Sequence, residues 1–240
     1  MSRPTGPGQA AQLPLALRYP PDQRFEGFVT SGEGMLAQLH ALATSAGSDW
    51  LYLVGAPGVG KTHLALAACA AAESSARRSA YLPLASATTR LCEALGALHD
   101  NDFIALDGLD AIAGQPDDEI ALFDFHNRAR DAGTAVLYTA RATPDALPLV
   151  LPDLRSRLSQ CTRMALAPLD DDGRRQVLRL RAQRRGLAID DAAIEWLLRR
   201  VDRDLGSLTT LLDQLDRASL AAQRRITVPF LRQVLGGDGS

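Results

Sequence analysis

The chain has 240 residues, of which 46% are hydrophobic and 22% are charged, values typical of a globular protein. Its formal net charge is −2 at pH 7, so it lacks the overall basic field that would hold nucleic acid non-specifically. The longest apolar run, at 64–72, is too short to span a bilayer, and the first residues lack the apolar core of a signal peptide. We therefore expect a cytoplasmic protein without a membrane segment. Cys69, Cys92 and Cys161 show no metal-ligand spacing, so we expect buried free thiols.

The order of predicted elements indicates an α/β protein. The first residues, 1–11, are rich in proline and glycine, and we expect them to be disordered. Strand-like runs then alternate with helical patterns, which predicts a parallel sheet with helices on both faces. The predicted strands are 50–55, 79–85, 102–107, 134–140 and 163–169, and the first three are followed by helices at about 60–73, 86–98 and 117–131. After Pro168 only helical periodicity remains, at 170–185, 190–202, 205–222 and 227–235.

This organisation predicts three parts. They are a flexible amino-terminal tail (1–20), an α/β domain with a five-stranded parallel sheet flanked by helices (21–168), and a small all-helical carboxy-terminal domain (169–240).

The segment GAPGVGKT (55–62) matches the phosphate-binding pattern G-x-x-x-x-G-K-[ST], and it follows an apolar strand and opens a helix. Its glycines allow backbone N–H groups to turn toward phosphate oxygens. Lys61 supplies a compact charge for the β- and γ-phosphates, and Thr62 offers a hydroxyl to Mg²⁺. Lys61 is the only lysine of the chain, retained where an ammonium and a guanidinium are not interchangeable. We expect a nucleotide site formed by Gly55, Ala56, Pro57, Gly58, Val59, Gly60, Lys61, Thr62 and His63.

A second acidic element lies in DFIALDGLD (102–110), where an apolar strand ends at Asp107. An aspartate at this place orients Mg²⁺ in P-loop proteins, although a strand-end aspartate can also serve only to form a turn. The next residue is Gly108, where a competent ATPase carries an acid that activates water. Asp110 lies three residues from Asp107, in a position that does not suit this role. We therefore expect a Mg²⁺ site at Thr62 and Asp107, with tight nucleotide binding and slow hydrolysis.

Downstream, VLYTARATPDALPLVLPDLRSRLSQ (136–160) resembles the sensor 1 and arginine-finger region of the replication initiator DnaA and its relatives. The segments LRLRAQRRGLAIDD and LDQLDRASLAAQRRITVPFLRQVL resemble the helical lid of one branch, the DnaA regulatory inactivator (Hda) family of AAA+ modules. The resemblance extends from about Gln12 to Leu235. It implies a P-loop AAA+ core with a lid domain, and ADP or ATP with Mg²⁺ as the cofactor.

The resemblance also assigns roles to residues after the sheet. Arg157 matches the arginine finger, which acts in trans by stabilising charge at a neighbour's nucleotide. A surface arginine is the simpler alternative for Arg157, and Arg155 has a positional role at most. Thr139 ends the fourth predicted strand, near the sensor 1 position of the nucleotide site.

This chain departs from the family pattern at two of these places. Arg141 stands where an acidic residue is common shortly after sensor 1. Gly206 stands where the family has its sensor 2 arginine, with Arg203 three residues earlier on the same helix face. The first departure changes the chemistry expected at sensor 1. The second, like Gly108, is expected to weaken hydrolysis by the chain itself.

At the amino terminus, QLPLAL (12–17) resembles the Q-L-x-L-x-L peptide by which this family docks on the DNA polymerase sliding clamp. An extended apolar peptide suits a hydrophobic groove, whereas the alternative is a hydrophobic lead-in to the first strand. The expected clamp contacts are Gln12, Leu13, Leu15 and Leu17. The segment RFEGFV (24–29) resembles the family's segment beside the adenine, although ordinary core packing explains Phe25 and Phe28 equally well.

The resemblance implies a negative regulator of replication initiation rather than an independent enzyme. It would dock on the DNA-loaded clamp, reach DNA only through that clamp, and stimulate hydrolysis of DnaA-bound ATP; homo-oligomer formation stays open. One alternative is a self-sufficient AAA+ ATPase such as a helicase or clamp loader, which Gly108 argues against. The other is a DNA-binding initiator fragment. No helix-turn-helix follows the lid-like segments, and pairs such as Arg174–Arg175 and Arg184–Arg185 are typical of solvated helix faces.

Overall fold

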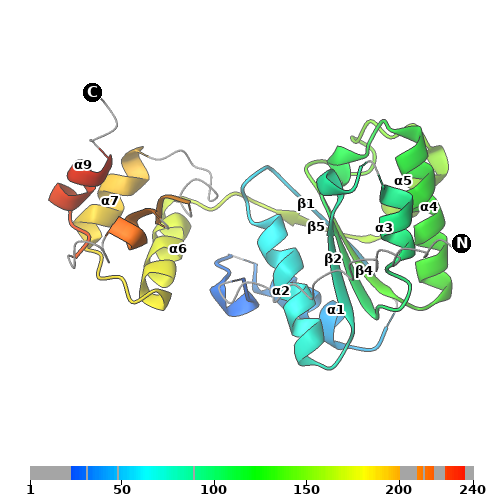
Figure 1. Ribbon diagram of the computed structural model, residues 1–240, viewed down its shortest axis with the longest axis horizontal. Helices are drawn as coiled ribbons and strands as arrows, with labels where there is room; N and C mark the ends of the chain where they lie inside the picture. Colours follow the sequence, from blue (N-terminus) through cyan, green and yellow to red (C-terminus); the bar gives the residue numbers. More distant parts are fainter. Residues whose placement is uncertain are drawn as a thin grey trace, which may run out of the picture.

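The structure is a computed structural model that describes residues 23–30, 32–47, 49–88, 90–200, 210–212, 214–218 and 225–235. An extended segment after the last strand joins an α/β body to a smaller helical body (Figure 1). Within the described ranges, no helix combines the length and apolar character needed to cross a membrane. The predicted clamp peptide (12–17) lies outside the described residues, as do Arg203 and Gly206.

The α/β body is built on five parallel strands in the order β2-β3-β4-β1-β5. The strands are β1 (Trp50–Gly55), β2 (Ser79–Pro83), β3 (Phe103–Asp107), β4 (Ala135–Ala140) and β5 (Thr162–Leu166). The inner strands are almost wholly apolar because helices cover both of their faces. Because all strands run the same way, Gly55, Asp107 and Thr139 lie together at the carboxyl end of the sheet. The predicted fold class is confirmed.

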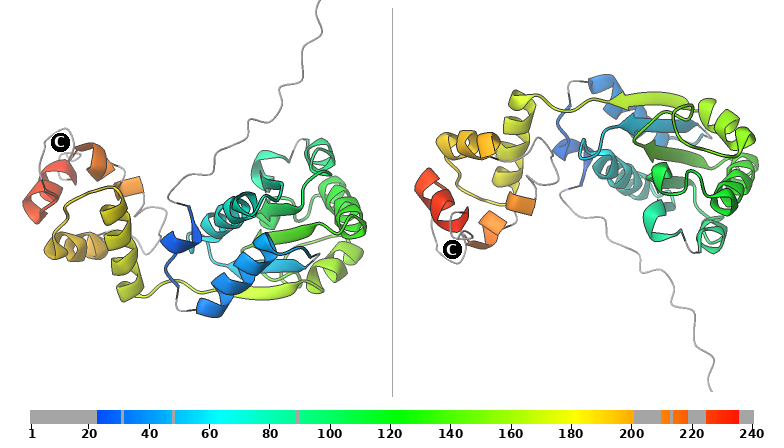
Figure 2. Two further views of the ribbon diagram at one scale, coloured as in Figure 1. Left: turned by 90° about the horizontal axis from the view of Figure 1, so that it is seen from below. Right: turned by 90° about the horizontal axis from the view of Figure 1, so that it is seen from above.

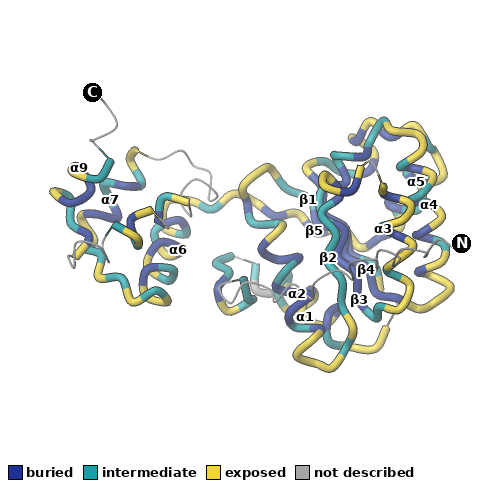
Figure 3. The backbone as a smooth tube through the Cα atoms, viewed as in Figure 1, coloured by how far each residue is buried: buried dark blue, intermediate teal, exposed yellow. Residues whose placement is uncertain are grey.

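Helices cover the two faces of the sheet (Figure 2), and the middle of the sheet is buried (Figure 3). Alternate residues of β1, β2, β3 and β4 supply the two cores. On one face, α1 (Glu33–Thr44) and α2 (Lys61–Ser74) pack against residues such as Leu53 and Leu137. On the other, α3 (Leu91–Gly96), α4 (Pro116–Asp131) and α5 (Pro152–Ser159) pack against residues such as Tyr52 and Leu106.

Some predicted elements needed correction. Helix α1 was not expected, although its buried residues Leu39, Leu42 and Ala43 show helical spacing. The strand expected at 79–85 ends at Pro83, whose missing N–H cannot continue a ladder, and the helix expected at 86–98 is only α3. Cys92 is exposed on α3, so the expectation of buried thiols holds only for Cys69 and Cys161.

The helical body consists of α6 (Asp171–Arg184), α7 (Asp191–Arg200), helical residues at 210–212 and 214–218, and α9 (Val228–Leu235). Its core is formed by buried apolar residues, including Leu197, Leu215, Ile226 and Leu231. Asp170 caps α6, since its Oδ1 accepts a 2.7 Å hydrogen bond from the Gly173 N–H. The predicted all-helical carboxy-terminal part is therefore confirmed.

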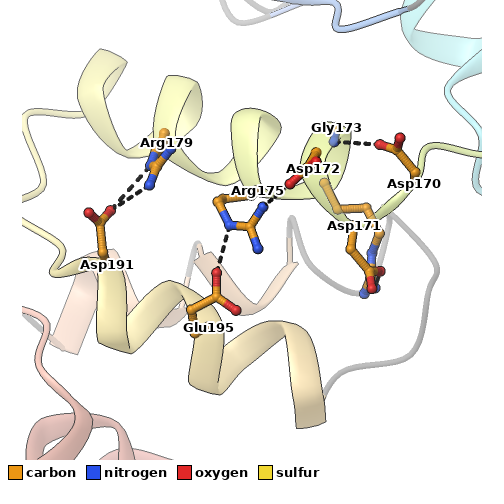
Figure 4. A network of polar contacts seen from close by, with 9 residues as sticks. Asp170, Asp171, Asp172, Gly173, Arg175, Arg179, Asp191 and Glu195 are labelled. Carbon is orange, nitrogen blue, oxygen red and sulfur yellow. Dashed lines mark hydrogen bonds and ion pairs between the residues drawn. The ribbon is translucent and has the colours of Figure 1, made fainter.

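Ion pairs join α6 to α7 along one side of this body (Figure 4). The Arg175 guanidinium bonds Glu195 at 2.6 Å and also pairs with Asp172, while Arg179 bonds Asp191 at 2.8 Å. The neighbouring Arg174 is 2% exposed. The prediction of a solvated face at Arg174–Arg175 was wrong, because Arg174 is buried and Arg175 is engaged between the two helices.

Candidate nucleotide-binding site

The loop between β1 and α2 has a shape that requires glycine. Gly58 and Gly60 have φ angles of 76° and 103°, a region that residues with a side chain rarely adopt. A Cβ on Gly60 would lie 2.6 Å from Phe28 Cε2, and one on Gly55 would lie 2.6 Å from the Leu166 carbonyl oxygen. The loop leads into the first turn of α2, whose backbone N–H groups have no partner within the helix. These groups form an anion-binding end at the carboxyl end of the sheet.

Lys61 is the first residue of α2, and its side chain turns back over the loop. Its Nζ donates hydrogen bonds to the carbonyl oxygens of Gly55 at 2.6 Å and Ala56 at 2.8 Å. Partial burial lowers the pKa of Lys61, and the negative charges of Asp110 and Asp107 act in the opposite direction. The ammonium therefore lies within electrostatic range of Asp107, the last residue of β3, and of Asp110 in the turn that follows.

Asp107 is the centre of a hydrogen-bond network at this end of the sheet. Its Oδ2 accepts from Thr62 Oγ1 at 2.7 Å and from the Tyr81 hydroxyl at 2.8 Å. Its Oδ1 accepts from the hydroxyl of the fully buried Thr139, which in turn accepts from the Gly108 N–H at 3.0 Å. The structure thus brings together Thr62, Asp107 and Thr139, three residues that were predicted separately.

Tyr81 was not predicted as part of this site. It lies on β2, beside the strand that carries Asp107. Burial raises the pKa of Tyr81 above its ordinary value, and the adjacent Asp107 raises it further. The hydroxyl therefore keeps its proton and acts as a donor to the carboxylate. Nothing in the residues around Tyr81 distinguishes it from an ordinary strand tyrosine.

The chain turns directly after Asp107, at Gly108 and the 3-10 helix Leu109–Ala111. Gly108 has a φ of 86°, and no atom lies within 4 Å of the place where its Cβ would be. The Asp110 carboxylate accepts hydrogen bonds of 3.1 Å and 2.9 Å from the Arg141 N–H. Asp110 is therefore occupied in fixing the turn that follows β4, which leaves the position after Asp107 without a carboxylate.

A cavity of about 270 Å³ lies between the phosphate loop and α6 of the helical body. Phe28 and Val29 line it from the segment before α1, and Val177 and Arg181 line it from α6. His63, a predicted site residue, is buried behind this segment. Its Nε2 lies 3.0 Å from the Arg24 carbonyl oxygen, and its ring lies 5.3 Å from that of Phe28. Arg181 was not predicted.

Arg157 lies at the other end of the sheet. It is in the last turn of α5, and it lines a second cavity with Trp50 and Thr162, which begin β1 and β5. The phosphate loop follows the opposite end of β1, so Arg157 cannot reach it. Arg155 on the same helix differs, because its guanidinium donates a hydrogen bond to the Leu149 carbonyl oxygen.

A buried carboxylate, also not predicted, positions α5. Glu119 on α4 is 0% exposed and accepts hydrogen bonds from the backbone N–H groups of Gly114 at 2.7 Å, Val150 at 2.9 Å and Leu151 at 2.7 Å. The last two belong to the turn immediately before α5. Glu119 therefore fixes the start of the helix that carries Arg157.

Together, the strand order, the phosphate loop after β1, the aspartate at the end of β3 and the helical body define a P-loop protein of the AAA+ class. Residues 171–235 match the family model of the Hda lid domain. The helical body is thus similar to an Hda lid domain, and the α/β body has a DnaA-like AAA+ fold.

Solved structures agree with this fold. Domain III of the replication initiation protein DnaA from Thermotoga maritima has a TM-score of 0.80 at 19% identity, over 91% of this chain and 98% of that one. AMPPCP-bound DnaA from Aquifex aeolicus has a TM-score of 0.67 at 19% identity, over 83% and 67%. The RuvB Holliday junction branch migration motor of Thermotoga maritima has a TM-score of 0.66 at 17% identity, over 90% and 72%. At these identities the likeness concerns the fold.

Proposed function

We propose that this protein is a nucleotide-dependent regulator that stimulates hydrolysis of ATP bound to DnaA and thereby limits replication initiation. The observation that carries the proposal is the position of Arg157. It lies at the amino end of the sheet, lining a cavity, whereas the phosphate loop lies at the carboxyl end. A guanidinium in this place serves the nucleotide of another molecule rather than its own.

The phosphate loop suits ADP or ATP with Mg²⁺. The positive φ angles of Gly58 and Gly60 open the loop toward the first turn of α2, and Lys61 supplies the charge for the β- and γ-phosphates. Thr62 and Asp107, already in contact at 2.7 Å, would hold the ion. A DnaA of the same fold has been solved with the nucleotide analogue AMPPCP, which supports this assignment.

Weak hydrolysis by the isolated chain is the second part of the proposal. Gly108 provides no side chain to activate water, and the nearby Asp110 is bonded to the Arg141 backbone. The nucleotide held by this chain would therefore act as a structural element that orders the loop and α6, which meet at the first cavity.

Arg157 is available for a partner. Among the described residues, no carboxylate forms an ion pair with it. An arginine without such a partner can place its planar guanidinium on a phosphoryl group, whose charge grows on the equatorial oxygens during transfer. The choice of DnaA as the partner is supported by the Hda lid match and by the DnaA-like fold.

Docking on the sliding clamp rests on the sequence alone. The peptide QLPLAL (12–17) fits an apolar groove of such a partner. In this arrangement the protein acts in the cytoplasm, on DNA that has already received a clamp, and it contacts that DNA only through the clamp.

The test is hydrolysis of DnaA-bound ATP with clamp-loaded DNA, with and without this protein. We expect stimulation by the wild type, and a rate at the unassisted level with Arg157→Ala. Arg128→Ala, an exposed residue in the last turn of α4, is the matched control and should keep full stimulation. Unchanged stimulation by Arg157→Ala would refute the mechanism.

The same assay without DnaA separates the alternatives. Appreciable ATP turnover by the isolated protein, abolished by Lys61→Ala, would identify a self-sufficient ATPase. Salt-dependent binding to DNA in the absence of the clamp would identify a DNA-binding initiator instead.

A further inference from the structure

A second arginine lines the cavity that contains Arg157. The cavity has a volume of about 260 Å³ and lies at the amino ends of β1 and β5. Arg157 lines the cavity from the last turn of α5, and Arg130 lines it from the last turn of α4. These two residues are far apart in the sequence, and the packing of α4 beside α5 brings them to one cavity.

The cavity carries a net positive charge. Asp49, at the exposed start of β1, is the only acidic residue in its lining. His126 in the lining is neutral at pH 7, because burial, together with the charges of Arg157 and Arg130, lowers its pKa to about 4. No ion pair of Arg130 or Arg157 is formed in the described part of the chain. Two guanidiniums and one carboxylate leave the cavity suited to an anion.

One wall of the cavity is formed by packed aromatic rings. The ring of Trp50 lies 4.1 Å from that of His126, and His126 Nδ1 lies 3.2 Å from the hydroxyl of the buried Tyr138. Buried aromatic groups lower the effective dielectric beside the cavity, which strengthens the attraction of its positive charges for an anion. The contacts of His126 also tie α4 to β1 and β4, which fixes the position of the helix that carries Arg130.

We propose that Arg130 acts with Arg157 as a second guanidinium on the terminal phosphate of a nucleotide held by the partner AAA+ module; this inference rests on the proposed function. A transferring phosphoryl group spreads its charge over three equatorial oxygens. Two planar guanidiniums can bond more of these oxygens than one can. Arg130 contributes charge and hydrogen bonds only, and it forms or breaks no covalent bond.

The experiment measures hydrolysis of DnaA-bound ATP with loaded clamp and the full-length chain carrying Arg130→Ala, Arg130→Lys, Arg157→Ala or both alanine changes. With this protein at saturating concentration, Arg130→Ala should lower the stimulated rate about 100-fold, the lower end of the range for loss of one preorganised donor. Arg130→Lys should restore part of it, because charge returns without the planar fork. The double change should be little worse than Arg157→Ala alone, since residues that act as a unit are not additive.

Arg128→Ala is the control, two residues away on α4 and outside the cavity lining. If Arg130→Ala and Arg128→Ala both match the wild type while Arg157→Ala does not, the role of Arg130 is overturned and the proposed function stands. If Arg157→Ala also matches the wild type, the proposed function itself fails. A loss with Arg130→Ala that disappears at saturating protein would also overturn the inference, because it would show a docking contact. Arg130→Gln replaces Arg130→Ala should the alanine variant fold poorly.

Discussion

The hydroxyl of Tyr81 donates a 2.8 Å hydrogen bond to Oδ2 of Asp107. Thr139 bonds the other oxygen of the same carboxylate from the opposite neighbouring strand. The aspartate at the end of β3 is therefore held from both sides, and its orientation is fixed before any ion arrives. Such supporting contacts strongly affect the affinity of a metal site.

Tyr81→Phe should therefore weaken nucleotide binding in a Mg²⁺-dependent manner. We expect a loss of about tenfold in affinity for ADP with Mg²⁺, and a much smaller loss in EDTA. Calorimetric titration measures both. Tyr52→Phe is the control, because it removes a similar hydrogen bond, 2.7 Å to the Ala142 carbonyl oxygen. An equal loss with and without Mg²⁺ would show that Tyr81 does not act through Asp107.

Gly60→Ala should abolish tight nucleotide binding. The new Cβ would lie 2.6 Å from Phe28 Cε2 at a φ of 103°, and the strained backbone alone costs about 1–3 kcal/mol. Binding of a fluorescent nucleotide and urea unfolding measure the two effects. Gly96→Ala, where no atom lies within 4 Å of the new Cβ, should leave both unchanged. Adding Phe28→Ala should relieve the clash but not the backbone strain, so full recovery in that double variant would contradict this account.

His126 should make the folded state sensitive to mild acid. Its pKa is about 4 in the folded protein against an ordinary 6.5. Between these two pH values, His126 is protonated in the unfolded chain but not in the folded protein. The free energy of unfolding therefore decreases as pH falls from about 6.5 to 4, and this residue contributes about 2 kcal/mol of that loss between pH 7 and pH 5. Urea unfolding of wild type and His126→Gln at both pH values isolates the effect. Equal pH dependence in the two proteins would show that His126 titrates normally.

Glu119→Gln should disturb the start of α5. The carboxylate accepts hydrogen bonds from the Val150 and Leu151 N–H groups. In the Gln variant, the side-chain NH2 group would face one of these backbone N–H groups, so two donors would meet without an acceptor. We expect a loss of about 1–3 kcal/mol in the free energy of unfolding and weaker stimulation of DnaA, because Arg157 is on this helix. Asp117→Asn, an exposed change in the same helix turn, is the control. If Glu119→Gln kept both its stability and its stimulation of DnaA, Glu119 would not be needed to position Arg157.

The sheet and the phosphate loop could be predicted because their signals are local. Each strand shows as an apolar run, and the loop needs a fixed spacing of glycines before Lys61. In contrast, α1 was missed because no capping side chain marks its start, since its N-cap is Gly32. The exposure of Cys92 depends on which side of a short helix faces outward, and six residues define no clear periodicity.

The missed site residues share a different cause. Tyr81 contacts a residue on a neighbouring strand, Glu119 contacts a turn after the next strand, and Arg130 meets Arg157 across two helices. None of these relations has a fixed spacing in the sequence, because they depend on strand order and helix packing. They become visible only once the fold is known.

The placement of the phosphate loop and Arg157 at opposite ends of one sheet gives the molecule a polarity. In the proposed function, Arg157 is donated at one end while the phosphate loop lies at the other. Two copies related by a two-fold axis would then bring identical ends together, and neither Arg157 would reach the other copy's phosphate loop. Head-to-tail contact is the arrangement that such a molecule supports, and it leaves one unfilled end at each terminus of the assembly. A chain whose Arg157 contacts a partner therefore still exposes its own phosphate loop at the opposite end, where another AAA+ module could bind.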